Sequence, residues 1–153
     1  MALVGLISDT HGLLRLEVVA ALSGVDHICH AGDVGNPEIL EELRAIAPVT
    51  AVRGNVDTDA WAQSLPPTAV VSIEGFNIYL LHALDLLDVN PRTANMAAVV
   101  SGHTHRGLIE TYDGVLYVNP GSAGPRRFSL PVSIGFLRLA QNRPIEAWLK
   151  MMD

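Results

Sequence analysis

The sequence predicts one α/β domain that spans residues 1–153. Hydrophobic residues make up 49% of the chain, which is enough for a compact core. The first third alternates short apolar runs with helix-like periodicity, a pattern typical of parallel strands joined by helices. The remainder contains β-type runs separated by turn residues, which indicates antiparallel hairpins. Together these patterns predict parallel strand-helix-strand units followed by hairpins.

Three strands and two helices are expected in the first third. The first strand begins at Leu3 and ends where its apolar run meets Asp9-Thr10-His11-Gly12. Ser23-Gly24 terminates the first helix, and the second begins where Asn36 can cap it and Pro37 fits its first turn. The remaining expected elements are helices over Leu13–Leu22 and from Pro37 to about Ile46, and strands over Val25–Ala31 and Val49–Val52.

The rest of the chain is expected to be mostly β-structure. Glu74-Gly75 and Asp113-Gly114 each separate two β-type runs, and Asp-Gly is a strong hairpin signal. A short helical piece is expected at Ala60–Ser64, and Leu84–Ala94 is read as a loop with a short helix after Pro91. The expected strands are Thr68–Ile73, Phe76–Leu81, Ala97–Val100, Leu108–Tyr112, Val115–Val118, Val132–Ala140 and Pro144–Lys150.

Composition excludes several classes of protein. The net charge of −6 and the absence of a Lys/Arg-rich run argue against extended nucleic-acid binding. No apolar run reaches the length that a bilayer-spanning helix needs, and the N-terminus lacks the basic start of a secretory signal. We therefore expect a cytoplasmic protein without a membrane contact. The single cysteine, Cys29, lies in an apolar segment and is expected in the core.

Five expected strand ends carry side chains that bind metals. In open α/β sheets, functional groups gather outside the carboxyl ends of the strands. All the candidate donors are nitrogen or oxygen atoms, which suits borderline or hard divalent cations such as Mn, Fe or Zn. Seven ligands are too many for one ion and suit a pair of ions about 3.5–4 Å apart with a bridging carboxylate. The seven residues are Asp9, His11, Asp33, Asn55, His82, His103 and His105.

These motifs and their order resemble the calcineurin-like metallophosphoesterases. The motifs are Asp9-x-His11, Gly32-Asp33, Gly54-Asn55, His82 and Gly102-His103-x-His105. The short chain and Asn119-Pro120-Gly121-Ser122 are most similar to the small single-domain phosphodiesterase subfamily. The resemblance implies the metallo-dependent phosphatase fold, a four-layer αββα sandwich of two mixed β-sheets flanked by helices.

The resemblance also implies the roles of the ligands. Asp9, His11 and His105 would hold one metal ion, Asn55, His82 and His103 the second, and Asp33 would bridge both. It implies a hydroxide between the metals that attacks a small phosphate ester in line, with phosphodiesters preferred and Asn55 contacting the phosphate. The catalytic set expected on this basis is Asp33, Asn55, His82 and His103. Manganese is favoured, with Fe, Zn, Ni or Mg as alternatives.

The chain departs from the family pattern at two places. Many members have His after the Gly-Asn pair, where it helps to protonate the leaving group, but this chain has Val56. Ala83 replaces a common Gly, and Leu84 stands where close relatives often have another His. The departure at Val56 leaves the general acid unidentified and favours activated or diester substrates. Asp57 is read here as a solvated loop carboxylate.

Four further residues are candidates for support of the site or for phosphate contact. His30 is expected to bond a ligand or to be a plain core or surface residue, and Arg53 to bind phosphate or to form a surface ion pair. Asn119 and Ser122 are expected either to support the loop of His103 and His105 or only to stabilise a local turn.

The sequence is also compatible with other functions. The same family includes a retromer coat subunit that keeps the fold and binds proteins, so a non-catalytic scaffold is one alternative. A phosphomonoesterase or protein phosphatase, or a nuclease, is another. The hairpins also leave an edge for a homo-oligomer.

Overall fold

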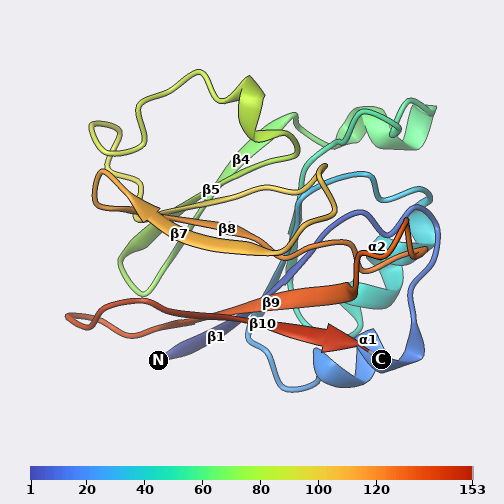
Figure 1. The fold of residues 1–153 in the computed structure, drawn as a ribbon, viewed down its shortest axis with the longest axis horizontal. Coiled ribbons are helices and arrows are strands. Elements are labelled where there is room, and N and C mark those ends of the chain that lie inside the picture. The colour runs from blue at the N-terminus through green and yellow to red at the C-terminus, as the bar shows by residue number, and fades with distance from the viewer. Residues whose placement is uncertain (153) are drawn as a thin grey trace.

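Two five-stranded β-sheets form the body of the molecule (Figure 1). The computed structural model describes residues 1–152. The first sheet has the order β10-β9-β1-β2-β3, in which β1, β2 and β3 are parallel and β9 and β10 are antiparallel to their neighbours. Its strands are β1 (Ala2–Ile7), β2 (His27–His30), β3 (Val49–Ala51), β9 (Val132–Leu139) and β10 (Glu146–Met152).

The second sheet is also mixed. Its order is β4-β5-β6-β8-β7, with β5, β6 and β8 parallel and both edge strands antiparallel to their neighbours. Its strands are β4 (Thr68–Ile73), β5 (Phe76–Leu81), β6 (Ala98–Val100), β7 (Leu108–Tyr112) and β8 (Val115–Asn119). Because β1 to β3 run parallel in one sheet and β5 and β6 run parallel in the other, each sheet presents a group of carboxyl ends.

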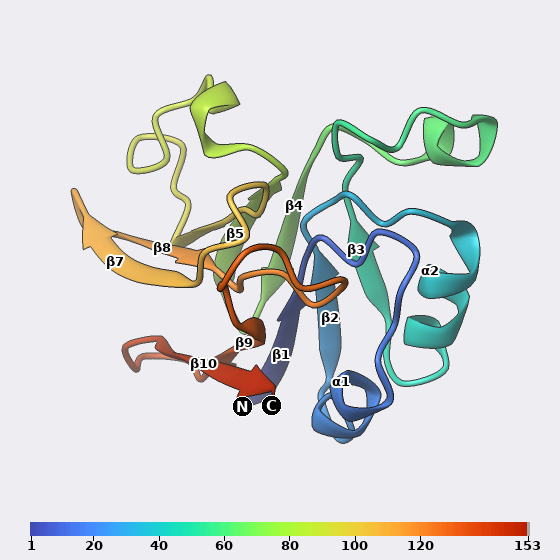
Figure 2. The ribbon, with the colours of Figure 1, turned by 45° about the vertical axis from the view of Figure 1, so that its right-hand side comes forward.

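Both α-helices pack on the first sheet (Figure 2). Helix α2 (Pro37–Arg44) begins as predicted, because the side chain of Asn36 accepts the Ile39 N–H at 3.3 Å. Helix α1 (Leu16–Ala21) begins three residues later than predicted. The reason is that the Leu13 N–H bonds the Thr10 carbonyl at 2.9 Å, which keeps residues 10–13 in a turn.

A loop covers the outer face of the second sheet. Within it, Leu84–Leu86 form the 3₁₀ helix η2, and Leu87 and Met96 pack against apolar side chains of that sheet. The predicted helix after Pro91 is wrong, because residues 91–95 form turns. The Asn90 side chain accepts the Arg92 N–H at 3.1 Å, and Asn95 has a left-handed φ of 63°, so no helix can propagate.

The other local predictions agree closely with the structure. The 3₁₀ helix η1 covers Ala60–Ser64, and the strand ends lie within two residues of their predicted positions. The two predicted hairpin turns are present. Glu74 and Gly75 have φ values of 52° and 82°, and Asp113 and Gly114 have 52° and 75°, as the tightest hairpins require.

Two apolar cores hold the layers together. One lies between the first sheet and the helices, and the other fills the space between the two sheets. Cys29 is fully buried in the inter-sheet core, as predicted, and burial raises the pKa of its thiol to about 12. The inter-sheet core consists of Val4, Leu6, Cys29, Ala31, Val52, Ile78, Leu80, Ala98, Val100, Val118, Leu137 and Leu139.

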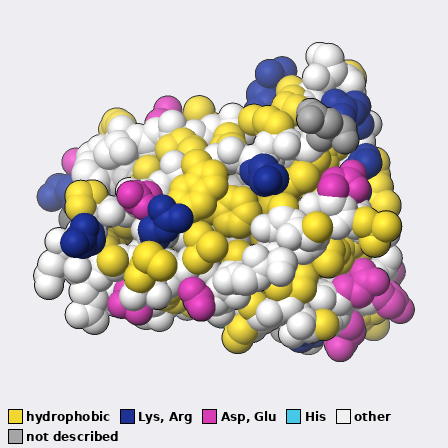
Figure 3. Space-filling view, turned by 90° about the horizontal axis from the view of Figure 1, so that it is seen from below, with side chains coloured by type: hydrophobic (Ala, Val, Ile, Leu, Met, Phe, Trp, Pro, Cys, Tyr) yellow, Lys and Arg dark blue, Asp and Glu magenta, His cyan; other side chains and the backbone are white. Residues whose placement is uncertain are grey.

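The lower face of the molecule carries apolar side chains at its centre with charged groups spread around them (Figure 3). The ring of Trp148 on β10 stacks on that of Phe136 on β9, with centroids 5.4 Å apart. The Arg138 guanidinium lies 4.9 Å from the Trp148 ring centroid and covers part of it. No helix within residues 1–152 has the length and apolar character needed to cross a bilayer.

Candidate metal centre

The seven candidate ligands follow the carboxyl ends of five parallel strands. Asp9 and His11 follow β1, Asp33 follows β2 and Asn55 follows β3. His82 follows β5, and the loop after β6 carries His103 and His105. The first sheet thus supplies four of these side chains and the second supplies three, and they meet across the upper edge of the sandwich.

A first group is formed by Asp9, His11 and His105. One donor atom from each lies within 4.8 Å of the others. Asp9 Oδ1 is 3.6 Å from His11 Nε2 and 3.3 Å from His105 Nε2. Asp9 is fully buried, and His105 is only 7% exposed. The sequence separation of 94 to 96 residues between Asp9 and the second-sheet loop is closed by the tertiary fold.

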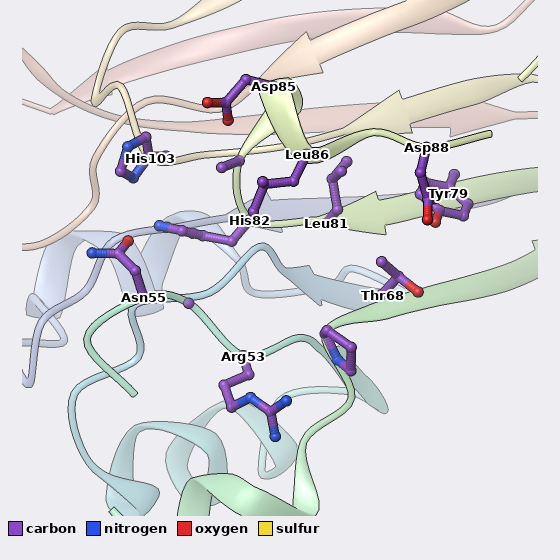
Figure 4. Close-up of a pocket in the computed structure, with 13 residues that line it drawn as sticks. Arg53, Asn55, Thr68, Tyr79, Leu81, His82, Asp85, Leu86, Asp88 and His103 are labelled. Atoms are coloured by element: carbon purple, nitrogen blue, oxygen red, sulfur yellow. The ribbon is translucent and has the colours of Figure 1, made fainter. Parts of the chain in front are cut away.

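A second group is formed by Asp33, His82 and His103, again with donor atoms within 4.8 Å. Asp33 Oδ2 lies 3.1 Å from His82 Nε2. The same oxygen lies 3.6 Å from His11 Nε2, so Asp33 faces both groups. Asn55 lines one cavity together with His82 and His103 (Figure 4).

Hydrogen bonds orient one end of Asp9 and one end of His82 and leave the other end of each side chain free. Asp9 Oδ2 accepts the Ser8 hydroxyl at 2.7 Å and the His103 N–H at 3.0 Å. His82 Nδ1 donates to the Ala31 carbonyl at 2.7 Å, which leaves Nε2 unprotonated in the neutral ring. Within residues 1–152, four buried donor or acceptor atoms have no hydrogen-bond partner: Asp9 Oδ1, His11 Nε2, His82 Nε2 and His105 Nδ1.

These unpartnered atoms fit a divalent cation. Leaving a buried polar atom unsatisfied costs about 1–3 kcal/mol, and four such atoms in one place require an explanation. Carboxylate oxygens and neutral imidazole nitrogens are the donors that Mn, Fe and Zn accept. The residues present therefore fit the metal pair that the sequence motifs imply.

The backbone at the site is held in an uncommon conformation. Five of the seven candidates are non-glycine residues with left-handed φ values: Asp9 at 57°, His11 at 46°, Asp33 at 56°, His103 at 73° and His105 at 64°. Such residues cost free energy and persist where the surroundings impose them, typically at functional sites. Gly54 is required for a different reason, since a Cβ there would collide with the backbone nitrogen and carboxylate of Asp33.

Neighbouring groups favour the ionised form of Asp33. Burial acts to raise the pKa of Asp33, but the contact with His82 and the hydrogen bond from Val56 N–H outweigh it and lower this pKa to about 2. Burial acts to lower the pKa of His82, but Asp33 and the Ala31 carbonyl raise it overall. Burial lowers the pKa of His105, which favours the neutral ring that a metal ion binds.

His30 lies beneath the site and contacts the Gly32 backbone and the Thr10 hydroxyl rather than a candidate ligand. Its ring is fully buried, and Nδ1 accepts the Gly32 N–H at 3.1 Å. Nε2 lies 3.0 Å from the Thr10 hydroxyl, which donates to the Val34 carbonyl at 2.7 Å, so Nε2 carries the proton. Burial lowers the pKa of His30 to about 4. His30 thus links the loops that follow β1 and β2.

The other three supporting candidates, Asn119, Ser122 and Arg53, each bond a different part of the backbone around the site. Asn119 Nδ2 donates to the Gly102 carbonyl at 3.0 Å and to the Thr104 hydroxyl at 3.1 Å, which braces the loop after β6. The Ser122 hydroxyl donates to the Asp9 carbonyl at 3.1 Å. Arg53 lines the cavity, but its guanidinium donates to the Leu65 carbonyl at 3.2 Å rather than to an acidic partner.

Asp57 is the residue whose role the sequence did not reveal. It is 3% exposed, so its assignment as a solvated carboxylate is wrong. Its carboxylate accepts three backbone N–H groups: Val34 at 3.1 Å, Gly35 at 3.1 Å and Gly54 at 2.9 Å. The sequence signal was its place in the loop three residues after Gly54, where an Asp often accepts nearby backbone N–H groups.

Comparisons with known proteins agree with this arrangement. Residues 2–142 match the calcineurin-like phosphoesterase superfamily domain. A probable metallophosphoesterase from Methanothermobacter thermautotrophicus is 34% identical, over 90% of this chain and 86% of that protein. A phosphodiesterase from Methanocaldococcus jannaschii is 25% identical, over 88% of this chain and 91% of that protein.

Solved structures share the fold across nearly the whole chain. An archaeal phosphodiesterase superimposes with a TM-score of 0.82 at 22% identity, covering 98% of this chain and 99% of its own. Wild-type Vps29 from Entamoeba histolytica, complexed with Zn²⁺, has a TM-score of 0.77 at 21% identity and covers 97% and 98%. The predicted architecture of two mixed sheets is confirmed, although both α-helices flank the first sheet and the outer face of the second is covered by a loop that contains η2. This chain belongs to the calcineurin-like phosphoesterase superfamily, as the order of its motifs predicted.

Proposed function

We propose that the protein is a dinuclear metal-dependent phosphodiesterase. The observation that carries this proposal is the convergence of four unpartnered buried donor atoms from two sheets on one edge of the fold. Membership of the phosphoesterase superfamily supports a hydrolase, and the similarity to a phosphodiesterase of M. jannaschii favours diesters.

The proposed ligand sets follow the two groups in the structure. Asp9, His11 and His105 would hold one cation, and His82 and His103 would hold the other with the amide oxygen of Asn55. Asp33 would contribute to both sets, since its Oδ2 lies 3.6 Å from His11 Nε2 and 3.1 Å from His82 Nε2. Manganese is the proposed native ion because every donor is nitrogen or oxygen, and Fe, Zn, Ni and Mg are the alternatives to test.

When bound, the two cations would lower the pKa of a metal-bound water to near neutral pH. They would also neutralise the charge of the phosphate oxygens. The residues of the chain supply position. Asn55 donates its amide N–H to a phosphate oxygen, and the cavity beside His82 and His103 receives one ester arm. The side chain at position 56 is Val, 47% exposed, and has no proton to give to the leaving oxygen. Esters with a stable leaving group are therefore the preferred substrates.

A metal-reconstitution assay tests the proposal. Protein stripped with a chelator receives Mn, Ni, Zn or Mg separately, and hydrolysis of bis(p-nitrophenyl) phosphate is compared with that of p-nitrophenyl phosphate. We expect diester turnover with Mn or Ni that His103→Ala abolishes and His27→Ala retains, since His27 bonds Thr50 away from the site. The proposal fails if His103→Ala hydrolyses the diester as fast as the native protein with the same metal.

A non-catalytic scaffold is the second candidate. It is favoured by the likeness to Vps29, one structure of which is a complex with a cyclic peptide. Metal binding alone does not separate the candidates, because another Vps29 structure contains Zn²⁺. Turnover does separate them, and metal binding without cleavage of either ester would make the scaffold the better description.

A further inference from the structure

A cavity of about 590 Å³ opens directly beside the second group of candidate ligands (Figure 4). Asn55, His82 and His103 form its inner end, so an ester arm of a phosphate held by these residues would enter it. A volume of this size is typical of sites that bind small organic molecules. Its apolar and aromatic lining consists of Pro67, Tyr79, Leu81, Ala83 and Leu86.

The cavity lies on the outer face of the second sheet. Side chains alternate along β5, so Ile78 and Leu80 point into the inter-sheet core while Tyr79 and Leu81 point outward. Both α-helices pack on the first sheet, and the loop after β5 covers the outer face of the second only in part. Tyr79 and Leu81 therefore give the cavity an apolar wall that belongs to the sheet itself.

Apolar side chains also remain exposed around this wall. Leu86 of η2 lines the cavity and is 73% exposed. Val70 of β4 lies opposite Tyr79 in the strand register and is 50% exposed. Apolar surface that remains uncovered beside a cavity favours the binding of a group that removes it from water. The wall and its rim thus share one preference, which is for hydrocarbon.

Charged residues of the cavity do not gather at one place. Asp85 lies on the side of His103, Asp88 lies beside Tyr79, and Arg53 lies across the cavity from Asp85 (Figure 4). The Arg53 guanidinium donates to the Leu65 carbonyl at 3.2 Å. The cavity therefore has an apolar wall but no cluster of like charges that would select an ionic arm.

We propose that this cavity binds an uncharged, apolar ester arm, and that the substrates are phosphodiesters with a hydrocarbon group on one side of the phosphate. This inference rests on the proposed phosphodiesterase function and names its substrate class. The phosphate lies at the ligand end, and the arm lies against Tyr79, Leu81 and Leu86. An arm with several oxygen atoms binds less well, because it loses hydrogen bonds to water that the apolar wall does not replace.

Two ligands of equal length test this preference. Hexyl phosphate and 2-(2-hydroxyethoxy)ethyl phosphate carry the same phosphate and the same number of chain atoms, but only the second has oxygen atoms in its chain. Calorimetry measures the Kd of each for the Mn-reconstituted protein. We expect hexyl phosphate to bind about tenfold more tightly. It should lose most of its affinity when a chelator removes Mn, and undiminished binding without Mn would place the chain elsewhere and overturn the inference.

A variant of the cavity and a matched control show where the chain binds. Leu86→Gln changes an exposed side chain, so the fold should persist, and it should reduce the preference for hexyl phosphate by about threefold or more. Leu16→Gln changes an equally exposed leucine of α1 that does not line the cavity, and it should retain the full preference. A preference that Leu86→Gln leaves intact would overturn the inference.

These binding measurements involve no turnover, so the inference and the proposed function can fail separately. Equal affinity of the native protein for the two ligands overturns the apolar arm, even if bis(p-nitrophenyl) phosphate is hydrolysed. Tighter binding of hexyl phosphate that depends on Leu86 supports the apolar arm even if no ester is cleaved, in which case only the phosphodiesterase proposal fails.

Discussion

The carboxylate of Asp57 accepts the backbone N–H of Val34 at 3.1 Å, across 23 residues of sequence. The same carboxylate accepts Gly35 and Gly54, so one buried side chain joins the loop after β2 to the loop after β3. Asp33 directly precedes the first contact, and Asn55 directly follows the last. The position of two candidate ligands relative to each other thus depends on a residue that faces neither metal group.

Replacement of Asp57 tests this dependence. Asp57→Ala leaves three N–H groups without their acceptor and should lower the free energy of unfolding by roughly 3 kcal/mol. Asp57→Asn keeps one acceptor oxygen and should cost less. Urea unfolding with chelator present measures both, and Asp59→Ala is the control, because Asp59 is exposed and makes no capping bond. An unchanged unfolding midpoint in Asp57→Ala would show that its three hydrogen bonds do not stabilise the fold.

His30 should make stability depend on pH. Its pKa is about 4 in the folded protein and about 6.5 when unfolded, so the unfolded chain binds a proton more readily. Its contribution is complete above pH 6.5 and is lost as the pH falls toward 4, by at most about 1.4 kcal/mol per pH unit. Unfolding curves at pH 7, 6 and 5 for native protein and His30→Gln check this. If the free energy of unfolding changes with pH equally in the two proteins, His30 is not the cause of the loss of stability at low pH.

Metal ions should stabilise the fold. The unpartnered donors at Asp9, His11, His82 and His105 bind a cation only when folded, so adding Mn at 100 times its Kd should add about 2.7 kcal/mol per independent site. A higher Tm on Mn addition to chelator-treated protein is the expected result. Elemental analysis should find two ions per native chain and one per chain of His105→Ala. A full complement of two ions in His105→Ala would argue against its place in the first ligand set.

Gly54 should be intolerant of a side chain. A Cβ there collides with Asp33, so Gly54→Ala should displace this carboxylate and lower Mn affinity and kcat/KM by at least tenfold. Gly75→Ala is the matched control, since it has open space around it, although its φ of 82° costs about 1 kcal/mol of stability. Mn titration of both variants measures the difference. Equal Mn affinity in Gly54→Ala and Gly75→Ala would show that the loop after β3 can shift to accommodate a Cβ at position 54.

Position 56 should control the choice of leaving group. Val56 is half-exposed beside the site, and its N–H, not its side chain, contacts Asp33 at 3.0 Å. Val56→His therefore keeps that contact and adds a proton donor. Cleavage of an alkyl diester should rise by tenfold or more, while that of bis(p-nitrophenyl) phosphate changes little because its leaving group needs no proton. An equal change in the cleavage rates of both esters would mean that the new histidine does not act by protonating the leaving group.

Local patterns in the sequence were sufficient for most of the secondary structure. Asn36 caps α2, and Asp113-Gly114 forms its hairpin, because capping and left-handed turns depend on a few neighbouring residues. The prediction failed after Pro91, where the side chain of Asn90 and the left-handed Asn95 form turns instead of a helix. An Asn side chain that accepts nearby backbone N–H groups competes with helix formation, and a residue pattern alone does not show whether that contact forms.

By itself the sequence determined the class of fold and the family, and it predicted which residues are the candidate metal donors. Motif order is readable along the chain, and donor chemistry belongs to the residue type. The tertiary structure alone decided which donors meet. Asp9 faces His105 only because the two sheets pack through an apolar core, and Asp57 is buried only because the loops after β2 and β3 close over it. Contacts between distant residues, and the burial that accompanies them, depend on packing and cannot be read from sequence spacing.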